Sequence, residues 1–241
     1  MNTALNGICP YFTMFPLTFP LAILTRHGRQ GDSVLDPFCG RGTTLYAARL
    51  RGMAACGLDS NPVAVAISRA KLANVAPVQM VRAAARILRK SVEPIEVPDG
   101  EFWRLAFSPA VLRDLCRLRQ ELLTDCRSDA RRALRAIILG ALHGPLTKTT
   151  PSYFSNQCPR TFAPKPAYAV RFWKTRRLLP PRVDVLGVIQ RRAERFYAEP
   201  QIGKWLLWMR SWISSIRAMG GRVWICRVAL GIGASDKVVS D

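Results

Sequence analysis

The chain has 241 residues, of which 49% are apolar, and its formal net charge is +20. This apolar share excludes a disordered chain, and the length suits one or two domains with a sizeable core. The excess of positive charge predicts a polyanionic partner. Seven cysteines without a Cys-x-x-Cys pair, and only two histidines, argue against a metal site and a disulfide framework. This cysteine pattern fits a reducing cytoplasm, where we expect the protein to be. With no apolar run of 18 residues, we expect no transmembrane helix and no membrane partner.

The first 32 residues contain an aromatic segment, residues 11–16, and then an apolar stretch over 21–24. The apolar stretch predicts a short helix that ends near His27. We expect this helix to pack beside the strand that follows it. The aromatic side chains are as typical of a core as of a binding site.

The segment 33–59 predicts the order strand, glycine-rich turn, helix and strand. Its apolar ends are typical of short buried parallel strands, and the proline and glycines over 37–42 end the first strand. Thr43 is the predicted N-cap of the helix and Gly52 its C-cap. This order is that of the first half of a doubly wound sheet, so we predict an α/β fold.

The glycine-rich turn is suited to a nucleotide-like ligand. Glycines let backbone N–H groups approach a ligand closely, and the N-terminus of the following helix favours an anion. Asp59, 23 residues after Asp36, is placed to accept hydrogen bonds from ribose hydroxyls. Leu45 stands where a dinucleotide-binding turn has its third glycine, which disfavours a nicotinamide or flavin cofactor.

Residues 36–44, Asp-Pro-Phe-Cys-Gly-Arg-Gly-Thr-Thr, resemble the cofactor motif of the DNA amino methyltransferases. Residues 57–62 and 11–16 resemble flanking segments of the same family, so the resemblance spans about residues 9–72. It implies a partial Rossmann-like methyltransferase sheet and transfer of a methyl group from S-adenosylmethionine to an exocyclic amine of cytosine or adenine in DNA. Such DNA methylation belongs to restriction-modification systems. The cofactor-binding residues that the resemblance implies are Phe15, Pro16, Asp36, Phe38, Gly40, Gly42, Thr43, Thr44 and Asp59.

Beyond residue 62 the sequence predicts a basic, helical part. Pro62 begins a helix that extends to Leu72, and helices that begin at Ser108 and Ser128 form a predicted helical hairpin. A further basic helix is predicted over 184–197. The predicted organisation is an S-adenosylmethionine-binding α/β module over 1–92, a helical and loop-rich insert over 101–198 and a basic, tryptophan-rich tail over 199–241.

Residues 145–182 are polar, aromatic and rich in turn residues. Amide and guanidinium groups read base edges and phosphates, and aromatic rings stack on bases. Because long irregular loops are usually functional, we predict a target-recognition insert that binds DNA. The alternative is an ordinary surface loop followed by an amphipathic helix. The predicted nucleic-acid contacts are Tyr153, Asn156, Gln157, Arg160, Arg171 and Lys174.

The catalytic motif that the resemblance leads us to expect is not in the sequence. In the family, a polar residue, two prolines and an aromatic ring bind the amine and stack on the extruded base. Residues 179–182 have two prolines without the polar and aromatic neighbours, and residues 150–153 have an aromatic ring but one proline. No catalytic residue is therefore assigned, and whether this chain alone is an enzyme stays open.

The composition changes near Pro200, where the family order places the catalytic strand. Residues 201–241 hold four of the six tryptophans, and no acidic residue lies between Glu199 and Asp236. We hypothesise that the reading frame slipped near this point. The alternatives are a naturally short relative and an amphipathic tail at a membrane surface.

The leading interpretation is a site-specific DNA methyltransferase that is incomplete or inactive as this single chain. A second polypeptide would then supply the catalytic half. An RNA base methyltransferase is one alternative, since its cofactor motif is similar, although DNA is the expected partner. A non-catalytic nucleic-acid-binding protein is the other, and the net charge supports it.

Overall fold

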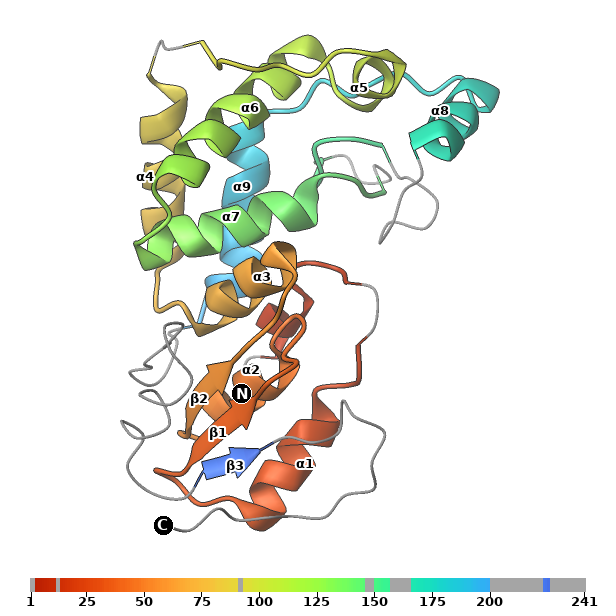
Figure 1. Cartoon of the computed structure of the whole chain (residues 1–241). Coiled ribbons are helices and arrows are strands. Elements are labelled where there is room, and N and C mark those ends of the chain that lie inside the picture. Colours follow the sequence, from red (N-terminus) through yellow and green to blue (C-terminus); the bar gives the residue numbers. More distant parts are fainter. Residues whose placement is uncertain are drawn as a thin grey trace. The chain divides into compact units, whose positions relative to one another are not determined.

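The computed structural model of the chain has a small parallel sheet and is otherwise mostly helical in its described parts (Figure 1). The structure describes residues 3–11, 14–90, 93–145, 150–156, 166–199 and 223–225. The chain divides into two compact units, which we call the sheet unit and the helical unit. Of the described residues, the sheet unit contains 3–6, 14–74 and 223–225, and the helical unit contains 7–11 and those from 75 to 199.

The sheet unit contains three parallel strands in the order β2-β1-β3. Ser33 of the central strand lies opposite Ala54 on one side and Val223 on the other. The chain therefore moves from β1 to one neighbour and later returns to the opposite edge, so the strand order reverses between β1 and β3. In open α/β sheets, ligands bind at the carboxyl ends of the strands at such a point. The strands are β1 (Ser33–Asp36), β2 (Ala54–Gly57) and β3 (Val223–Ile225).

The predicted strands and helices of the first 72 residues are confirmed, but both predicted caps of the helix after β1 are wrong by one residue. Its C-cap is Arg51, and Gly52 is the residue after the cap. Gly42, with φ +71°, is the N-cap, and Thr43 is the first helical residue. The carbonyl of Gly42 accepts the first intrahelical bond, from Tyr46 N at 3.0 Å, so the helix begins one residue earlier than an N-cap at Thr43 requires. The helices here are η1 (Ala4–Gly7), α1 (Thr18–His27), α2 (Thr43–Leu50) and α3 (Pro62–Leu72).

Two buried cations hold the end of α3. The Arg49 guanidinium donates from Nη1 to the carbonyls of Lys71 at 2.5 Å and Ala73 at 3.1 Å, which lie where α3 ends and its carbonyls lack helical partners. Lys71 Nζ donates to Asn6 Oδ1 at 2.8 Å. Because buried charges are costly unless they are hydrogen-bonded, these contacts fix α3 beside α2 in one arrangement.

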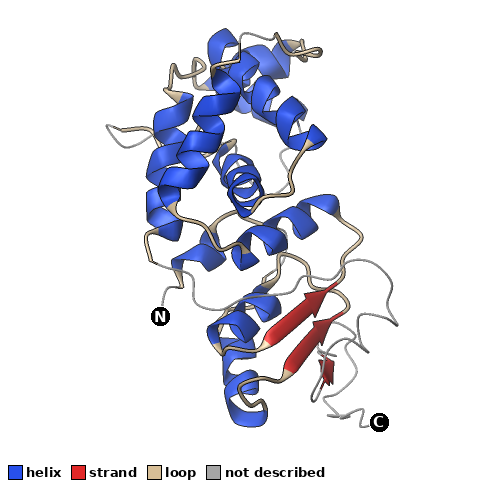
Figure 2. Cartoon of the chain, turned by 90° about the vertical axis from the view of Figure 1, so that its left-hand side faces the viewer, coloured by secondary structure: helices blue, strands red, loops and turns tan. Residues whose placement is uncertain are grey.

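The helical unit is built from six helices in its described part (Figure 2). The predicted N-cap Ser128 accepts a hydrogen bond from Arg131 N, whereas Ser108 is at the predicted cap position without such a bond. Asp184, predicted as the first residue of its helix, is instead the N-cap and accepts a hydrogen bond from Leu186 N. Their bounds are α4 (Pro77–Leu88), α5 (Glu101–Ala106), α6 (Pro109–Thr124), α7 (Asp129–Ala141), α8 (Pro166–Thr175) and α9 (Val185–Tyr197).

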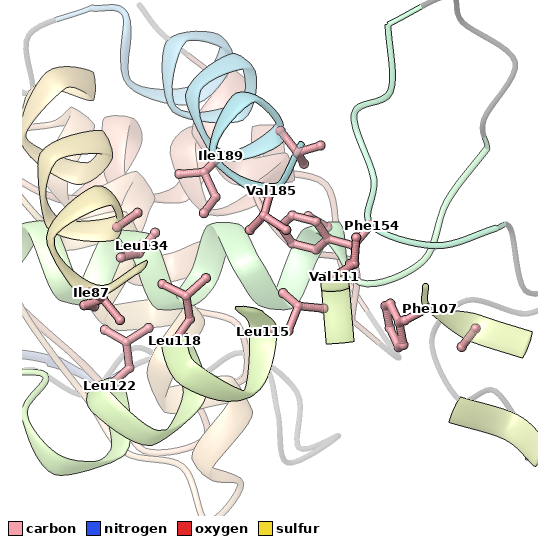
Figure 3. Close-up of a cluster of buried hydrophobic side chains, with 14 of the residues drawn as sticks. Ile87, Phe107, Val111, Leu115, Leu118, Leu122, Leu134, Phe154, Val185 and Ile189 are labelled. Atoms are coloured by element: carbon pink, nitrogen blue, oxygen red, sulfur yellow. The ribbon is translucent and has the colours of Figure 1, made fainter. Parts of the chain in front are cut away.

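One hydrophobic core holds the helical unit together, and the apolar stripe of α6 lies within it (Figure 3). The stripe faces Ile87 of α4, Leu134 of α7 and Ile189 of α9. All four of its residues are buried, as the spacing of the sequence predicts: Val111, Leu115, Leu118 and Leu122.

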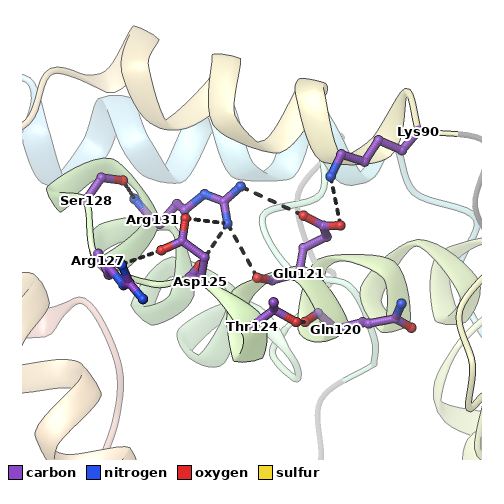
Figure 4. Close-up of polar contacts among 8 residues, drawn as sticks. All are labelled: Lys90, Gln120, Glu121, Thr124, Asp125, Arg127, Ser128 and Arg131. Atoms are coloured by element: carbon purple, nitrogen blue, oxygen red, sulfur yellow. Dashed lines mark hydrogen bonds and ion pairs between the residues drawn. The ribbon is translucent and has the colours of Figure 1, made fainter.

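Ion pairs lie at the end of α6 and in the loop between α6 and α7 (Figure 4). Lys90 Nζ, after the end of α4, lies 2.9 Å from Glu121 Oε1. Arg131 Nη1 donates to the carbonyl of Asp125 at 2.8 Å and lies 3.3 Å from its carboxylate. Exposed pairs of this kind contribute little to stability, but they neutralise part of the basic charge of this unit.

Candidate cofactor-binding site

The turn after β1 depends on two glycines with left-handed backbones. Gly40 has φ +50° and Gly42 has φ +71°. A Cβ atom added at Gly42 would lie 2.6 Å from Ser68 Oγ, whereas one added at Gly40 would meet no atom within 4 Å. Gly42 is therefore required by packing, and Gly40 exposes backbone to open space, as close approach by a ligand requires.

Asp59 ties this turn to the loop after β2. Its Oδ2 accepts from Gly40 N at 2.8 Å and its Oδ1 accepts from Asn61 N at 2.8 Å. Each carboxylate oxygen has a further lone pair, so this arrangement leaves acceptors for ribose hydroxyls. The ribose-binding role of Asp59 stays a prediction, and the structure adds a role in holding the turn.

Ser68 of α3 belongs to the site, although the sequence analysis did not select it. Its buried hydroxyl donates to the carbonyl of Gly40 at 2.9 Å. Cys39 Sγ lies 3.9 Å away, and burial together with the charge of Asp36 raises the pKa of this thiol to about 12. The thiol is therefore neutral at pH 7 and is no nucleophile. No local pattern in the sequence singles out Ser68, because its contact with the turn depends on how α3 packs.

Asp36 ends the central strand as a buried carboxylate. Its Oδ1 accepts from Phe38 N at 3.1 Å. Burial raises the pKa of Asp36 above the usual value of 3.8, and the nearby charge of Asp59 adds to that effect. A buried acid at the carboxyl end of a strand is costly to ionise, and such perturbed groups are typical of functional sites.

Gly57 of β2 explains why a leucine can stand at position 45, where a dinucleotide-binding turn has its third glycine. A Cβ atom added at Gly57 would lie 2.5 Å from Leu45 Cδ1 and 2.9 Å from Cys39 Cβ. In a dinucleotide-binding turn, the third glycine allows close packing of helix on strand. Here Gly57 allows that packing, so the large side chain of Leu45 fits on the helix.

The aromatic residues predicted for the cofactor are partly exposed. Phe38 in the turn is 57% exposed. Phe15 is 38% exposed, and its ring contacts Phe19 edge-on at 5.7 Å between centroids.

Arg41 in the turn donates to the sulfur of Met14, which places the segment before Phe15 beside the turn. Pro16 follows in that segment and is exposed, and Thr43 and Thr44 are buried in the first turn of α2.

The residues predicted to contact nucleic acid lie in the helical unit. The Tyr153 ring has the Arg192 guanidinium 5.2 Å from its centroid, and Asn156 is buried and donates to the carbonyl of Leu179 at 2.7 Å. These contacts give both residues structural roles. Arg171 and Lys174 are on α8, where Lys174 pairs with Glu101. Gln157 and Arg160 lie outside the described residues. All six stay predictions as nucleic-acid contacts.

Two further features concern the described residues only. None of their helices is long and apolar enough to cross a membrane. In the same part of the chain, no three His, Cys, Asp or Glu side chains gather in a way that could hold a metal ion.

One of the comparisons with known proteins matches the segment that contains this turn. Residues 2–70 match the model of a DNA methylase family. A segment of 67 residues is 37% identical to the type II methyltransferase M.MjaII of Methanocaldococcus jannaschii, and it covers 28% of this chain and 13% of that protein. No solved structure matches the chain significantly. The similarity to DNA methylases therefore covers residues 2–70, and the match to the curated relative spans only a small part of that protein's length.

Proposed function

We propose that the sheet unit binds S-adenosylmethionine and that the chain is the cofactor-binding part of a DNA amino methyltransferase. The turn from Asp36 to Thr43 carries this proposal, because it puts open glycine backbone and the carboxyl group of Asp36 at the carboxyl end of β1, with the Asp59 carboxylate bonded to Gly40 N. This end lies where the strand order reverses between β1 and β3, the place at which open α/β sheets bind ligands.

The residues at the turn fit this cofactor. Gly40 leaves room for a ligand against the backbone, and the exposed ring of Phe38 offers a face for an adenine base. The carboxylate of Asp59 would accept hydrogen bonds from the ribose, and Phe15 and Pro16 would lie near the methionine end. S-adenosylmethionine, when bound, supplies a methyl group on a sulfonium, and an exocyclic amine of cytosine or adenine in DNA would accept it.

The helical unit would hold the DNA through basic residues of α8 and the segment after it. Arg171, Arg176 and Arg177 are exposed there, and the Arg176 guanidinium lies 4.2 Å from the centroid of the Phe172 ring. Arginines of this kind bind phosphates, and their planes also stack on bases. We further propose that a second polypeptide supplies the catalytic half, because the sequence contains no polar-Pro-Pro-aromatic motif.

A non-catalytic nucleic-acid-binding protein is the second candidate. The missing catalytic motif and the net charge of +20 favour it. The two candidates differ in whether the chain must bind S-adenosylmethionine. A methyltransferase part binds S-adenosylmethionine at the turn, whereas a plain nucleic-acid binder need not.

Calorimetric titration of the full chain with S-adenosylmethionine tests the proposal. The chain should bind one equivalent, and Phe38→Ala should weaken binding by about tenfold through loss of ring contact, since each tenfold is about 1.4 kcal/mol. Ile23→Ala is the matched control, because Ile23 is a partly exposed apolar residue (37%) on α1 of the same unit. A folded chain that binds no S-adenosylmethionine would overturn the proposal and leave the second candidate.

A further inference from the structure

We propose that the helical unit contains a binding site for a small aromatic anion, independent of the proposed cofactor site. A cavity of about 680 Å³ lies among α5, α6, α7 and the segment 96–98. Its volume is within the range of roughly 300–1,000 Å³ that is typical of small-molecule sites. All residues that line it belong to the helical unit.

One end of the cavity is aromatic. Phe102 and Trp103 of α5 line it, with ring centroids 5.3 Å apart, and Phe107 and His143 lie 5.5 Å from each other in the same wall. Burial lowers the pKa of His143 to about 4, so its imidazole is neutral at pH 7. This end therefore offers ring faces and edges without charge, which suits a planar apolar group.

The other end of the cavity is cationic. Arg119 and Arg135 line it. Arg119 lies in the half of α6 next to the loop 125–128, and Arg135 lies at the middle of α7, eight residues before His143. Among the described residues, neither guanidinium has a carboxylate within ion-pair distance. By contrast, Arg113 and Arg117 of α6 both pair with Glu93. The cavity thus combines an apolar wall with two cations that lack an ion-pair partner.

The only acid that lines the cavity, in the described part of the chain, is the exposed Glu96. Two positive charges and one negative charge leave a net charge of +1 at the lining, with the cations at one end. Guanidinium groups bind carboxylate or sulfonate in two-point geometry, whereas a neutral ring has no partner at this end. The ligand that fits is therefore a fused or substituted aromatic ring that carries one anionic group.

Fluorescence titration of the full chain with two dyes tests this inference. 8-Anilinonaphthalene-1-sulfonate carries the anion, and N-phenyl-1-naphthylamine has the same rings without it. We expect the sulfonate dye to bind one site, and Arg119→Gln and Arg135→Gln each to weaken its binding by about 5- to 10-fold. The neutral dye should change by less than about twofold in both variants, because the rings do not contact the guanidinium groups.

Two further variants sharpen the test. Glu96→Gln should strengthen binding of the sulfonate dye by about two- to threefold, because it removes a like charge from the lining. Arg113→Gln is the matched control on α6, since Arg113 does not line the cavity, and neither dye should respond to it.

The inference fails if both arginine variants bind the sulfonate dye as the unchanged chain does, or if the dye occupies several equivalent sites. Ile138→Trp gives an independent outcome, because the indole would fill part of the cavity. Both dyes should lose binding in this variant, with near-ultraviolet circular dichroism showing that it is folded. Unchanged dye binding in the folded Ile138→Trp variant would place the dye elsewhere and would overturn the inference.

Discussion

Gly42 is the residue on which the shape of the candidate cofactor turn depends most strongly. Its φ is +71°, and a Cβ atom there would lie 2.6 Å from Ser68 Oγ. Gly42→Ala should lower the free energy of unfolding by about 1–3 kcal/mol, because it adds backbone strain and a clash. Urea denaturation measures the change. Gly7→Ala is the control, since an added Cβ at Gly7 meets nothing within 4 Å, and it should change stability by less than about 1 kcal/mol.

Asp36 should lower the stability of the chain at neutral pH. Burial raises the pKa of its carboxyl in the folded state, so the folded chain binds the proton more tightly than the unfolded chain. Its contribution to stability is therefore greatest at low pH and is lost as the pH rises through the raised folded pKa. Asp36→Asn, which keeps an acceptor for Phe38 N, should remove this pH dependence.

Thermal unfolding of the two proteins between pH 4 and pH 7 gives the measurement. The melting temperature of Asp36→Asn relative to the unchanged chain should rise with pH across this range. A difference that is constant with pH would contradict the assignment. If Asp36→Asn is more stable than the unchanged chain at pH 7, then Asp36 lowers the stability of the chain, as functional groups often do.

At the scale of elements, the stripe of α6 stabilises the helical unit. Leu118 is fully buried against α4, α7 and α9. Leu118→Ala should lower the free energy of unfolding by about 2–5 kcal/mol, through lost burial and the cavity left behind. Leu123→Ala on the same helix is the matched control, since Leu123 is 60% exposed and should cost less than about 1 kcal/mol. Similar losses in both variants, read from chemical denaturation, would be evidence against this core.

Arg192 of α9 holds the segment 7–11 against the helices of its unit. Its Nη2 donates to the carbonyl of Ile8 at 3.0 Å, and the side chain is buried. Arg192→Met should cost about 1–3 kcal/mol, because that carbonyl loses its charged donor in a buried place. Arg195→Met is the control on the exposed face of α9, with a cost below about 0.5 kcal/mol. Equal melting temperatures for the two variants would refute a role for Arg192 in this contact.

Most elements of the described chain could be predicted, because their ends carry strong local signals. Pro62, Pro109 and the caps Ser128 and Asp184 begin helices where propensity places them. The exact start of α2 could not be predicted, since Thr43 is a good N-cap in isolation. The turn is closed by Gly42 N donating to the Cys39 carbonyl at 2.7 Å, and that bond puts the cap at Gly42.

At the scale of the whole molecule, a net charge of +20 predicts binding to duplex DNA that weakens steeply with salt. Fluorescence anisotropy at several KCl concentrations should give a linear fall of log affinity with log salt. Replacing both Arg171 and Arg176 with Gln should reduce the magnitude of that slope by roughly 2, about one for each phosphate contact. Arg117→Gln is the control, because Arg117 already pairs with Glu93 at 2.7 Å and with Asp114 at 3.3 Å. An unchanged slope in the double variant would argue against DNA binding by α8 and the segment after it.

The sequence by itself determined the alternation of strand, turn and helix over 33–72, and the motif in it that resembles amino methyltransferases. These features are local, since periodicity, glycines, prolines and motif spacing act over a few residues. The contacts between distant positions were decided by the tertiary structure alone. Ser68 reaches the Gly40 carbonyl from 28 residues away, and Asn156, predicted to read bases, is buried against the Leu179 carbonyl. No local sequence pattern predicts which side chain will lie against which distant carbonyl. These pairs form only when the apolar faces of the helices and strands are buried together.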